Sequence, residues 1–201
     1  MSMSLRIAAC AAVAASFLSL NISTPASARE VVAFDGGASA GTIVVRTSER
    51  KLYLVLGDGK ALRYTVGVGR AGRQWAGRAF IDGKYVKPAW SPPPDIRRDK
   101  PNLPSVIPGG SAENPMGAAA MTLSGGGSYA IHGTNSPSSI GGFVSYGCIR
   151  MHNQDIVDLY ERVNVGTPVM VTRLNPDWLW VSAPRLATCA AVAAYVAGVE
   201  Q

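Results

Sequence analysis

Short runs of β-branched and aromatic residues, separated by glycine-containing turns, constrain the fold of this chain more than any other feature of its sequence. Residues 42–46 (TIVVR) and 52–56 (LYLVL) have the length and composition of neighbouring strands. The turn Gly57-Asp58-Gly59 closes the second run and leads into a third at 61–68. Similar runs return later, at 119–123, 129–132 and 169–172. The sequence therefore predicts a mainly β domain, built as a β-sandwich or a mixed sheet.

One short segment after Cys148 has a clear helical pattern. Its apolar residues Ile156, Leu159 and Val163 fall three or four positions apart, which places them on one face of a helix. Asn153 is a favourable N-cap residue, and Gly166 is well placed to end the helix. We expect few other helices.

The segment 88–108 is interrupted by prolines, among them the run Pro92-Pro93-Pro94. Proline lacks a backbone donor, and its ring clashes with the preceding helical turn. We therefore expect no helix here and interpret the segment as an ordered surface crossing over the sheet.

The first 28 residues have the three-part layout of an export signal. A short start with Arg6 leads into the apolar run 7–20, and the small-residue site Ala26-Ser27-Ala28 follows. We predict a signal peptide at 1–28 and an exported protein of the periplasm or cell envelope. The alternative is a lipoprotein signal acylated at Cys10, but it would leave almost no apolar core before that cysteine.

The charge of the chain selects no partner by itself. Removal of the leader takes away Arg6 as its one charged residue, so the formal net charge of +6 falls to about +5. A modest basic excess suits an anionic envelope polymer, a membrane surface or nucleic acid, and scattered surface charges explain it equally well. We predict no nucleic-acid partner.

Two cysteines remain after the predicted cleavage, Cys148 and Cys189. An even pair in an oxidising compartment can form a disulfide. Cys189, however, lies inside the apolar run 186–199, where cysteine commonly serves as a small hydrophobic residue. We divide the mature chain into a domain at 41–173 and a C-terminal tail at 174–201. The tail is predicted to dock as a helix, with weak membrane contact as the alternative.

Cys148 and the two histidines of the chain are the candidates for chemistry near neutral pH. A thiol needs a base or a cation beside it to become a nucleophilic thiolate. His132 ends a strand-like run, from which a rigid sheet edge would project it, whereas His152 precedes the helix and is expected to be solvated. Considered alone, a single histidine or a single cysteine is more often structural than catalytic. The pairing of Cys148 with His132 is what makes these two residues candidates.

We predict neither a metal nor a cofactor. Zinc needs about three or four protein ligands, and two histidines with one well-placed cysteine fall short of that set. The chain has no phosphate-cradling glycine motif followed by Lys-Ser/Thr, and Gly67-Val68-Gly69 lacks the helix and acidic partner of a dinucleotide site.

Two segments resemble the catalytic signature of the L,D-transpeptidases, bacterial enzymes that cross-link peptidoglycan stem peptides. They are His132-Gly133-Thr134-Asn135 and 145–151 (SYGCIRM). Upstream blocks match the family in order, namely 64–69 (YTVGVG), 75–77 (WAG), 88–93 (PAWSPP), 108–110 (PGG) and 114–117 (NPMG). Ordered blocks are a more specific signal than one short motif. The resemblance covers roughly residues 41–173 and implies the family's mainly β fold.

The resemblance also implies roles for single residues. Cys148 would attack a peptide carbonyl with His132 as its base, and the carbonyl of Gly133 would orient the imidazole. The backbone amides of Tyr146, Gly147 and Cys148 would form the oxyanion hole. The residues expected to contact substrate are Ser145, Thr134, Asn135 and Arg150.

Two positions leave alternatives open. Arg150 would either hold a substrate carboxylate or brace the turn. Tyr146 stands where many family members have a histidine, and a phenol with a pKa of about 10 is a poor base at neutral pH. The oxyanion role needs a backbone N–H, which tyrosine retains, so we expect an active enzyme with an altered substrate preference.

The function implied is transfer of a stem peptide through a Cys148 thioester onto an amine of a second stem, which forms a 3→3 cross-link. The alternatives are a cysteine L,D-carboxypeptidase, attachment of a lipoprotein lysine, exchange of the terminal D-amino acid, and a wall-binding module without catalysis. Because carbapenems acylate cysteines of this family, we also expect a carbapenem target.

Overall fold

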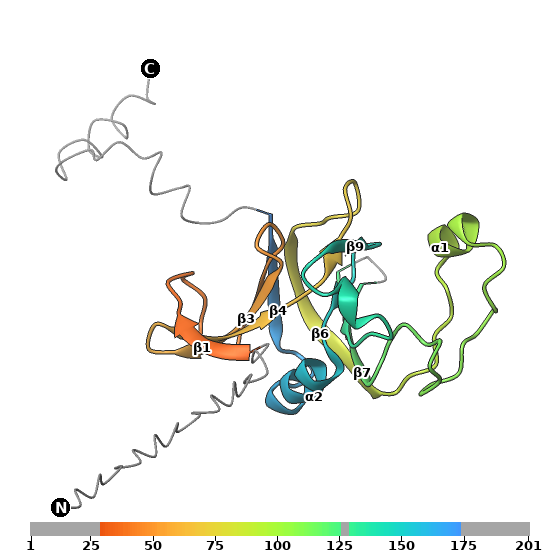
Figure 1. Cartoon of the computed structure of the whole chain (residues 1–201). Coiled ribbons are helices and arrows are strands. Elements are labelled where there is room, and N and C mark those ends of the chain that lie inside the picture. The colour runs from red at the N-terminus through yellow and green to blue at the C-terminus, as the bar shows by residue number, and fades with distance from the viewer. Residues whose placement is uncertain (1–28, 126–128, 174–201) are drawn as a thin grey trace, which may run out of the picture.

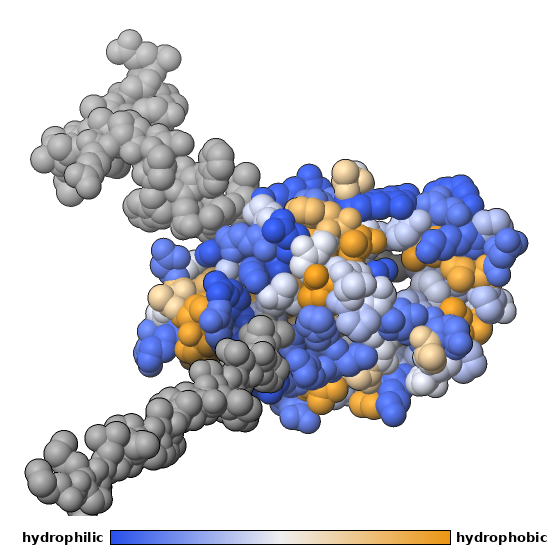
Figure 2. All heavy atoms as spheres, in the orientation of Figure 1, coloured by the Kyte–Doolittle hydropathy of each residue, from blue (hydrophilic) through white to orange (hydrophobic). Residues whose placement is uncertain are grey.

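The computed structural model describes residues 29–125 and 129–173. The predicted signal peptide at 1–28, the predicted tail helix and Cys189 therefore lie outside the described residues. Within the described part of the chain, no helix is long and apolar enough to span a membrane. Hydrophilic residues cover most of the face shown in Figure 2, with apolar patches scattered among them.

A nine-stranded mixed sheet organises the domain (Figure 1). In spatial order its strands are β1 (Arg29–Ala33), β4 (Lys60–Thr65), β3 (Lys51–Gly57), β2 (Ile43–Arg46), β11 (Pro168–Thr172), β6 (Gly77–Val86), β7 (Ala119–Leu123), β8 (Ala130–His132) and β10 (Ile149–Arg150). The β2–β11 and β8–β10 pairs are parallel, and the other pairs are antiparallel. A second sheet pairs β5 (Val68–Gly69) with β9 (Phe143–Ser145) in parallel. The mainly β prediction is confirmed.

Alternation along β2 and β3 explains why these strands lie inside the sheet. Ile43 and Val45 pack in the main hydrophobic core, whereas Val44 packs on the other face with Tyr53 and Val55. Successive side chains of a strand point to opposite faces, so both faces here are covered. Burial on two sides gives the continuous apolar runs that the sequence shows.

The helix after Cys148 is α2 (Asn153–Arg162), which packs against β7 and β8 and buries Ile156 and Leu159. The predicted start at Asn153 is confirmed, but the assignment of Asn153 as N-cap and the predicted end at Gly166 are wrong. His152 occupies the N-cap position and Asn153 is the first helical residue. The helix ends before Val163, and Gly166 instead has a φ of +90° in the following turn.

The prediction of no helix in 88–108 is also wrong. This segment contains α1 (Pro94–Asp99), with proline at the first helical position. Proline is tolerated there because the first helical N–H groups have no partner within the helix. Residues 95–99 contain no further proline. The long connection from β6 to β7 carries α1 out to one side of the sheet (Figure 1).

Asn114 fixes the base of this long connection. Its side-chain Nδ2 donates to the carbonyls of Pro88, Ile107 and Pro108, and its Oδ1 accepts from the N–H of Met116. The side chain is buried at 2% exposure. One buried amide thus holds both ends of the connection together, while α1 lies out to one side of the sheet (Figure 1).

Candidate active site

Strand pairing brings the two candidate catalytic side chains to one place. His132 ends β8, and Cys148 directly precedes β10, the parallel neighbour in which Arg150 pairs with His132. All three residues line one pocket of about 800 Å³. Residues separated by 16 positions in sequence therefore share one cavity at the edge of a rigid sheet.

The long connection from β6 to β7 supplies much of the pocket's remaining lining. Its contributing residues are Trp90, Ser91, Pro93, Pro94, Asp95, Ile96, Pro115 and Met116. The pocket thus combines reactive side chains at the edge of the sheet with the proline-rich connection between β6 and β7.

The turn before Cys148 requires glycine. Gly147 has a φ of +124°, a conformation that side chains rarely adopt. A Cβ at Gly147 would also lie 2.3 Å from the ring of Tyr129. That ring stacks on Trp75 with 4.9 Å between centroids, and Trp75 Nε1 donates to the Gly147 carbonyl at 2.9 Å. Two aromatic rings and a hydrogen bond therefore fix the backbone that presents the thiol.

The side chain of Ser145 makes two hydrogen bonds within this turn. Its Oγ donates to the carbonyl of Cys148 at 2.6 Å and accepts from the N–H of Gly147 at 3.0 Å. The side chain lines the pocket but the residue is 1% exposed. Because the Gly147 amide already has this partner, it would have to leave Ser145 to bind an oxyanion.

His132 is held in one tautomer. Its Nδ1 lies 2.7 Å from the carbonyl oxygen of Gly133. A carbonyl can only accept, so Nδ1 carries the proton and Nε2 presents a lone pair. The residue is 4% exposed. Burial, together with the positive charge of Arg150, lowers the pKa of His132 to about 4 against the opposing carbonyls of Gly133 and Pro115.

The thiol and the imidazole are both neutral near pH 7. Burial raises the pKa of Cys148, which the backbone of Ala130 and the charge of Arg150 oppose. A neutral imidazole with a free Nε2 lone pair can accept a proton. The arrangement therefore favours proton removal during attack on a substrate over a stored thiolate–imidazolium pair.

Arg150 adds a positive charge beside this pair. Its backbone is fixed on both sides by Gly67, through N–H to carbonyl bonds of 2.8 Å in each direction. Its Nε is buried and has no hydrogen-bond partner among the described residues. Burial also lowers the pKa of Arg150. A buried guanidinium N–H without a partner costs free energy, which an acceptor that reached it would recover.

Asn153 holds the chain that follows His132, and the sequence had suggested only a helix cap. Its Oδ1 accepts from the N–H groups of Ala118 and Thr134, each at 3.0 Å, and its Nδ2 donates to the Thr134 carbonyl. A Cβ at Gly133 would lie 2.3 Å from this Oδ1. The Gly133 carbonyl that orients His132 thus belongs to a backbone clamped from α2.

Thr134 and Asn135 lie beside the pocket and are not among its lining residues. Thr134 is buried, and its Oγ1 accepts from the N–H of Ser136. Asn135 is exposed, and its Nδ2 donates to the Ala112 carbonyl at 3.3 Å. Their expected contact with substrate stays a prediction without support from the pocket geometry.

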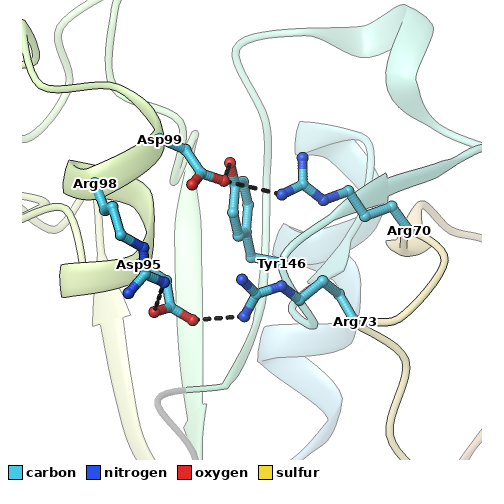
Figure 3. A network of polar contacts seen from close by, with 6 residues as sticks. All are labelled: Arg70, Arg73, Asp95, Arg98, Asp99 and Tyr146. Carbon is cyan, nitrogen blue, oxygen red and sulfur yellow. Dashed lines mark hydrogen bonds and ion pairs between the residues drawn. The ribbon is translucent and has the colours of Figure 1, made fainter.

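Tyr146 lines the pocket and contacts α1. Its hydroxyl donates to Asp99 Oδ2 at 2.7 Å, and the guanidinium of Arg70 lies 4.1 Å above its ring centroid (Figure 3). The hydrogen bond to Asp99 raises the pKa of Tyr146, so the phenol is no base near neutral pH. Sequence reasoning missed this contact because it expected no helix in that segment.

The low pKa of His132 predicts a loss of stability in acid. The unfolded state binds this proton near the ordinary value of 6.5, whereas the folded state binds it near 4. Stability present above pH 6.5 is therefore lost as the pH falls toward 4, by about 3 kcal/mol from this group. Urea unfolding at pH 7 and at pH 4 measures it. The pH-dependent loss should be smaller by that amount in His132→Gln, and equal losses in both proteins would contradict the burial argument.

Comparison with known proteins gives a consistent result. The family model of the L,D-transpeptidase catalytic domain (YkuD) matches residues 40–171. "Probable L,D-transpeptidase ErfK/SrfK" of Escherichia coli K12 is 39% identical over 160 residues, which cover 71% of this chain and 50% of that protein. "Probable L,D-transpeptidase YbiS" of the same organism is 37% identical over 136 residues, 63% of this chain and 43% of that protein.

Solved structures of other proteins share this fold. An Enterococcus faecium L,D-transpeptidase with a cysteine-to-serine substitution superposes with a TM-score of 0.52 at 19% identity, covering 67% of this chain and 50% of that one. The chain spans about half the length of the curated relatives described above. The match of the family model over most of the described domain shows that this chain belongs to the L,D-transpeptidase catalytic domain family.

Proposed function

We propose that this chain is a cysteine-dependent L,D-transpeptidase of the cell envelope that forms 3→3 cross-links between peptidoglycan stem peptides. The observation that carries the proposal is the pair of Cys148 and His132 in one pocket, with Nδ1 of the imidazole held by the carbonyl of Gly133. Export would follow from cleavage of the leader at 1–28, and stem peptides are the proposed partners.

Acylation would begin with Cys148 and His132 both neutral. As Sγ attacks the carbonyl carbon of the third stem residue, Nε2 of His132 takes the thiol proton. The tetrahedral intermediate collapses when the C–N bond to the terminal D-amino acid breaks. His132 returns its proton to that leaving amine, and a thioester to Cys148 remains. No proton has to be supplied from outside the pair.

The developing negative charge needs donors beside the thiol. We propose the backbone amides of Tyr146 and Cys148 for this role, with Gly147 as a third donor only if it leaves Ser145. Loss of one such donor typically costs about 10²–10³ in rate. Arg150 would contribute its charge, since the same cation already opposes the burial penalty on ionised Cys148.

Deacylation would reverse the proton path. An amine of a second stem attacks the thioester carbonyl, His132 takes the amine proton, and the thiolate leaves and recovers a proton from His132. The product is an amide between two stems. Arg150 is proposed to hold a substrate carboxylate near this centre, since its buried Nε lacks a partner among the described residues.

Product analysis tests the proposal against its alternatives. The native protein and Cys148→Ala are incubated with purified disaccharide-tetrapeptides, and products are identified by mass. We expect cross-linked dimers from the native protein and none from the variant. Tripeptide monomers alone would identify a carboxypeptidase, and coupling solely to an added lysine-bearing lipoprotein peptide would identify an attachment enzyme. Retention of the ligand without any product would leave only a wall-binding module.

A further inference from the structure

Two arginines and two aspartates join α1 to the neighbouring wall of the pocket. Asp99 accepts from Tyr146 at 2.7 Å and from Arg70 at 3.0 Å, while Asp95 accepts from Arg73 at 2.5 Å. Figure 3 shows the two guanidinium groups pointing across the gap toward α1. Arg73, Asp95 and Tyr146 line the same pocket as Cys148. The network therefore forms part of the wall that a bound substrate would meet.

Arg73 is only partly engaged. Among the described residues, its guanidinium donates one hydrogen bond, from Nη1 to Asp95 Oδ2, and lies 5.5 Å from the Tyr146 ring centroid. The group carries five N–H donors in all. Its side chain is 33% exposed. Arg73 is thus a cation in the pocket wall with donors to spare and with solvent access.

Asp95 has a second partner. Its Oδ2 accepts from Arg73, and its Oδ1 accepts from Arg98 at 2.6 Å. Both arginines lower the pKa of Asp95, Arg73 most strongly. If Asp95 lost Arg73, it would keep Arg98 and remain a paired carboxylate. If another carboxylate replaced Asp95 at Arg73, Arg73 would be paired with that carboxylate and Asp95 would be paired with Arg98.

The helix would also stay in place during such an exchange. Asp99 attaches α1 through Tyr146 and Arg70 independently of Asp95. The Arg73–Asp95 pair is solvent-exposed on both sides, at 33% and 44%. Exposed ion pairs are weak and exchange readily with other anions. The two parts of the network therefore have different roles. The contacts of Asp99 anchor α1, and the Arg73–Asp95 ion pair can be replaced by another anion.

We propose that Arg73 is a carboxylate-binding residue for the substrate, and that Asp95 occupies it in the empty pocket as a replaceable counter-ion. The ligand is an internal carboxylate of an acidic peptide, located away from the carbonyl that Cys148 attacks. This inference rests on the proposed function, because it takes the stem peptide as that acidic peptide. It assigns Arg150 and Arg73 to two different carboxylates of one substrate.

Steady-state kinetics on two peptides test the assignment. One is a tetrapeptide stem with its internal carboxylates free, and the other is the same stem with those carboxylates amidated and its C-terminus still free. For the acidic peptide, Arg73→Gln should raise KM about fivefold, the upper range for an exposed ion pair. Asp95→Asn removes the competing anion and should lower that KM about twofold to threefold. Neither variant should change KM for the amidated peptide.

Arg98→Gln is the matched control, because it removes the other ion pair of Asp95 from a residue outside the pocket lining. Its KM values should remain within about twofold of native values, the size of a surface ion-pair effect. Equal changes for both peptides in Arg73→Gln, or no change for either, would overturn the assignment. Absence of product from either peptide with the native protein would instead overturn the proposed function.

Discussion

Replacement of Cys148 with alanine is expected to reduce release of the terminal D-amino acid by about 10³-fold or more, because loss of a catalytic nucleophile removes the covalent route altogether. No other described cysteine can take its place, since Cys148 is the one cysteine in residues 29–125 and 129–173. The release rate from a disaccharide-tetrapeptide measures the effect.

The fold of this variant should survive, which separates chemistry from stability. The backbone of the turn is held by contacts that do not involve the thiol: Trp75 on the Gly147 carbonyl, and the hydroxyl of Ser145 on the Cys148 carbonyl and the Gly147 amide. Thermal unfolding should therefore change little in Cys148→Ala, and also in Cys148→Ser, whose hydroxyl is close in shape to the thiol. A variant with a native unfolding midpoint and undiminished turnover would show that another residue is the nucleophile.

Replacement of His132 with glutamine is expected to slow acylation of Cys148 by about 10²–10⁴-fold, the usual contribution of a general base. The amide side chain can still donate to the Gly133 carbonyl, as Nδ1 of His132 does, but it offers no base. Acylation by a carbapenem, followed by intact mass at successive times, measures the rate at Cys148.

Tyr146→His supplies the comparison for the same rate. It places a histidine at the position where many family members have one, and it removes the phenol that donates to Asp99. If His132 is the base, this change should alter the acylation rate by less than about tenfold, well below the general-base contribution. A large gain in Tyr146→His, or a native rate in His132→Gln, would assign the base to position 146.

The sequence predicted the strands that are buried on both faces. β2 and β3 bury side chains on both faces, so each contains a nearly continuous apolar run, IVV in β2 and LYLVL in β3. β6 was missed because its buried residues, such as Ala79 and Ile81, alternate with exposed residues of mixed character, which include the charged Arg78 and Asp82 as well as the aromatic Phe80 and Tyr85. The run 61–68 was predicted as one strand, yet β4 ends at Thr65, and β5 belongs to a different sheet.

The sequence predicted the catalytic residues of the candidate site but not the residues that hold them in place. Cys148 and His132 were found because a thiol with a histidine is an unusual pair in a chain that has only two histidines. Asn153 was interpreted as a cap because its bonds to Ala118 and Thr134 depend on how α2 packs against the sheet. Such distant partners leave no local pattern in the sequence.

The wall of the pocket was the least predictable part. Proline at the start of α1 hid a helix of six residues, and the aspartates of that helix meet arginines from about twenty to thirty positions earlier. A signal was present in the spacing of Asp95 and Asp99, which face the same side of a helix when four residues apart. This spacing can be interpreted only once the segment is known to be a helix.

The central claim is that a stem peptide becomes covalently bound to Cys148, and peptide mapping of the acid-quenched protein tests it most directly. After incubation with a tetrapeptide and no acceptor, we predict one adduct with the mass of the tripeptide acyl group. It should map to the fragment that contains Cys148 and should be absent in Cys148→Ala. An adduct on Cys189 or any other residue, or tripeptide product formed at the native rate by Cys148→Ala, would contradict the account.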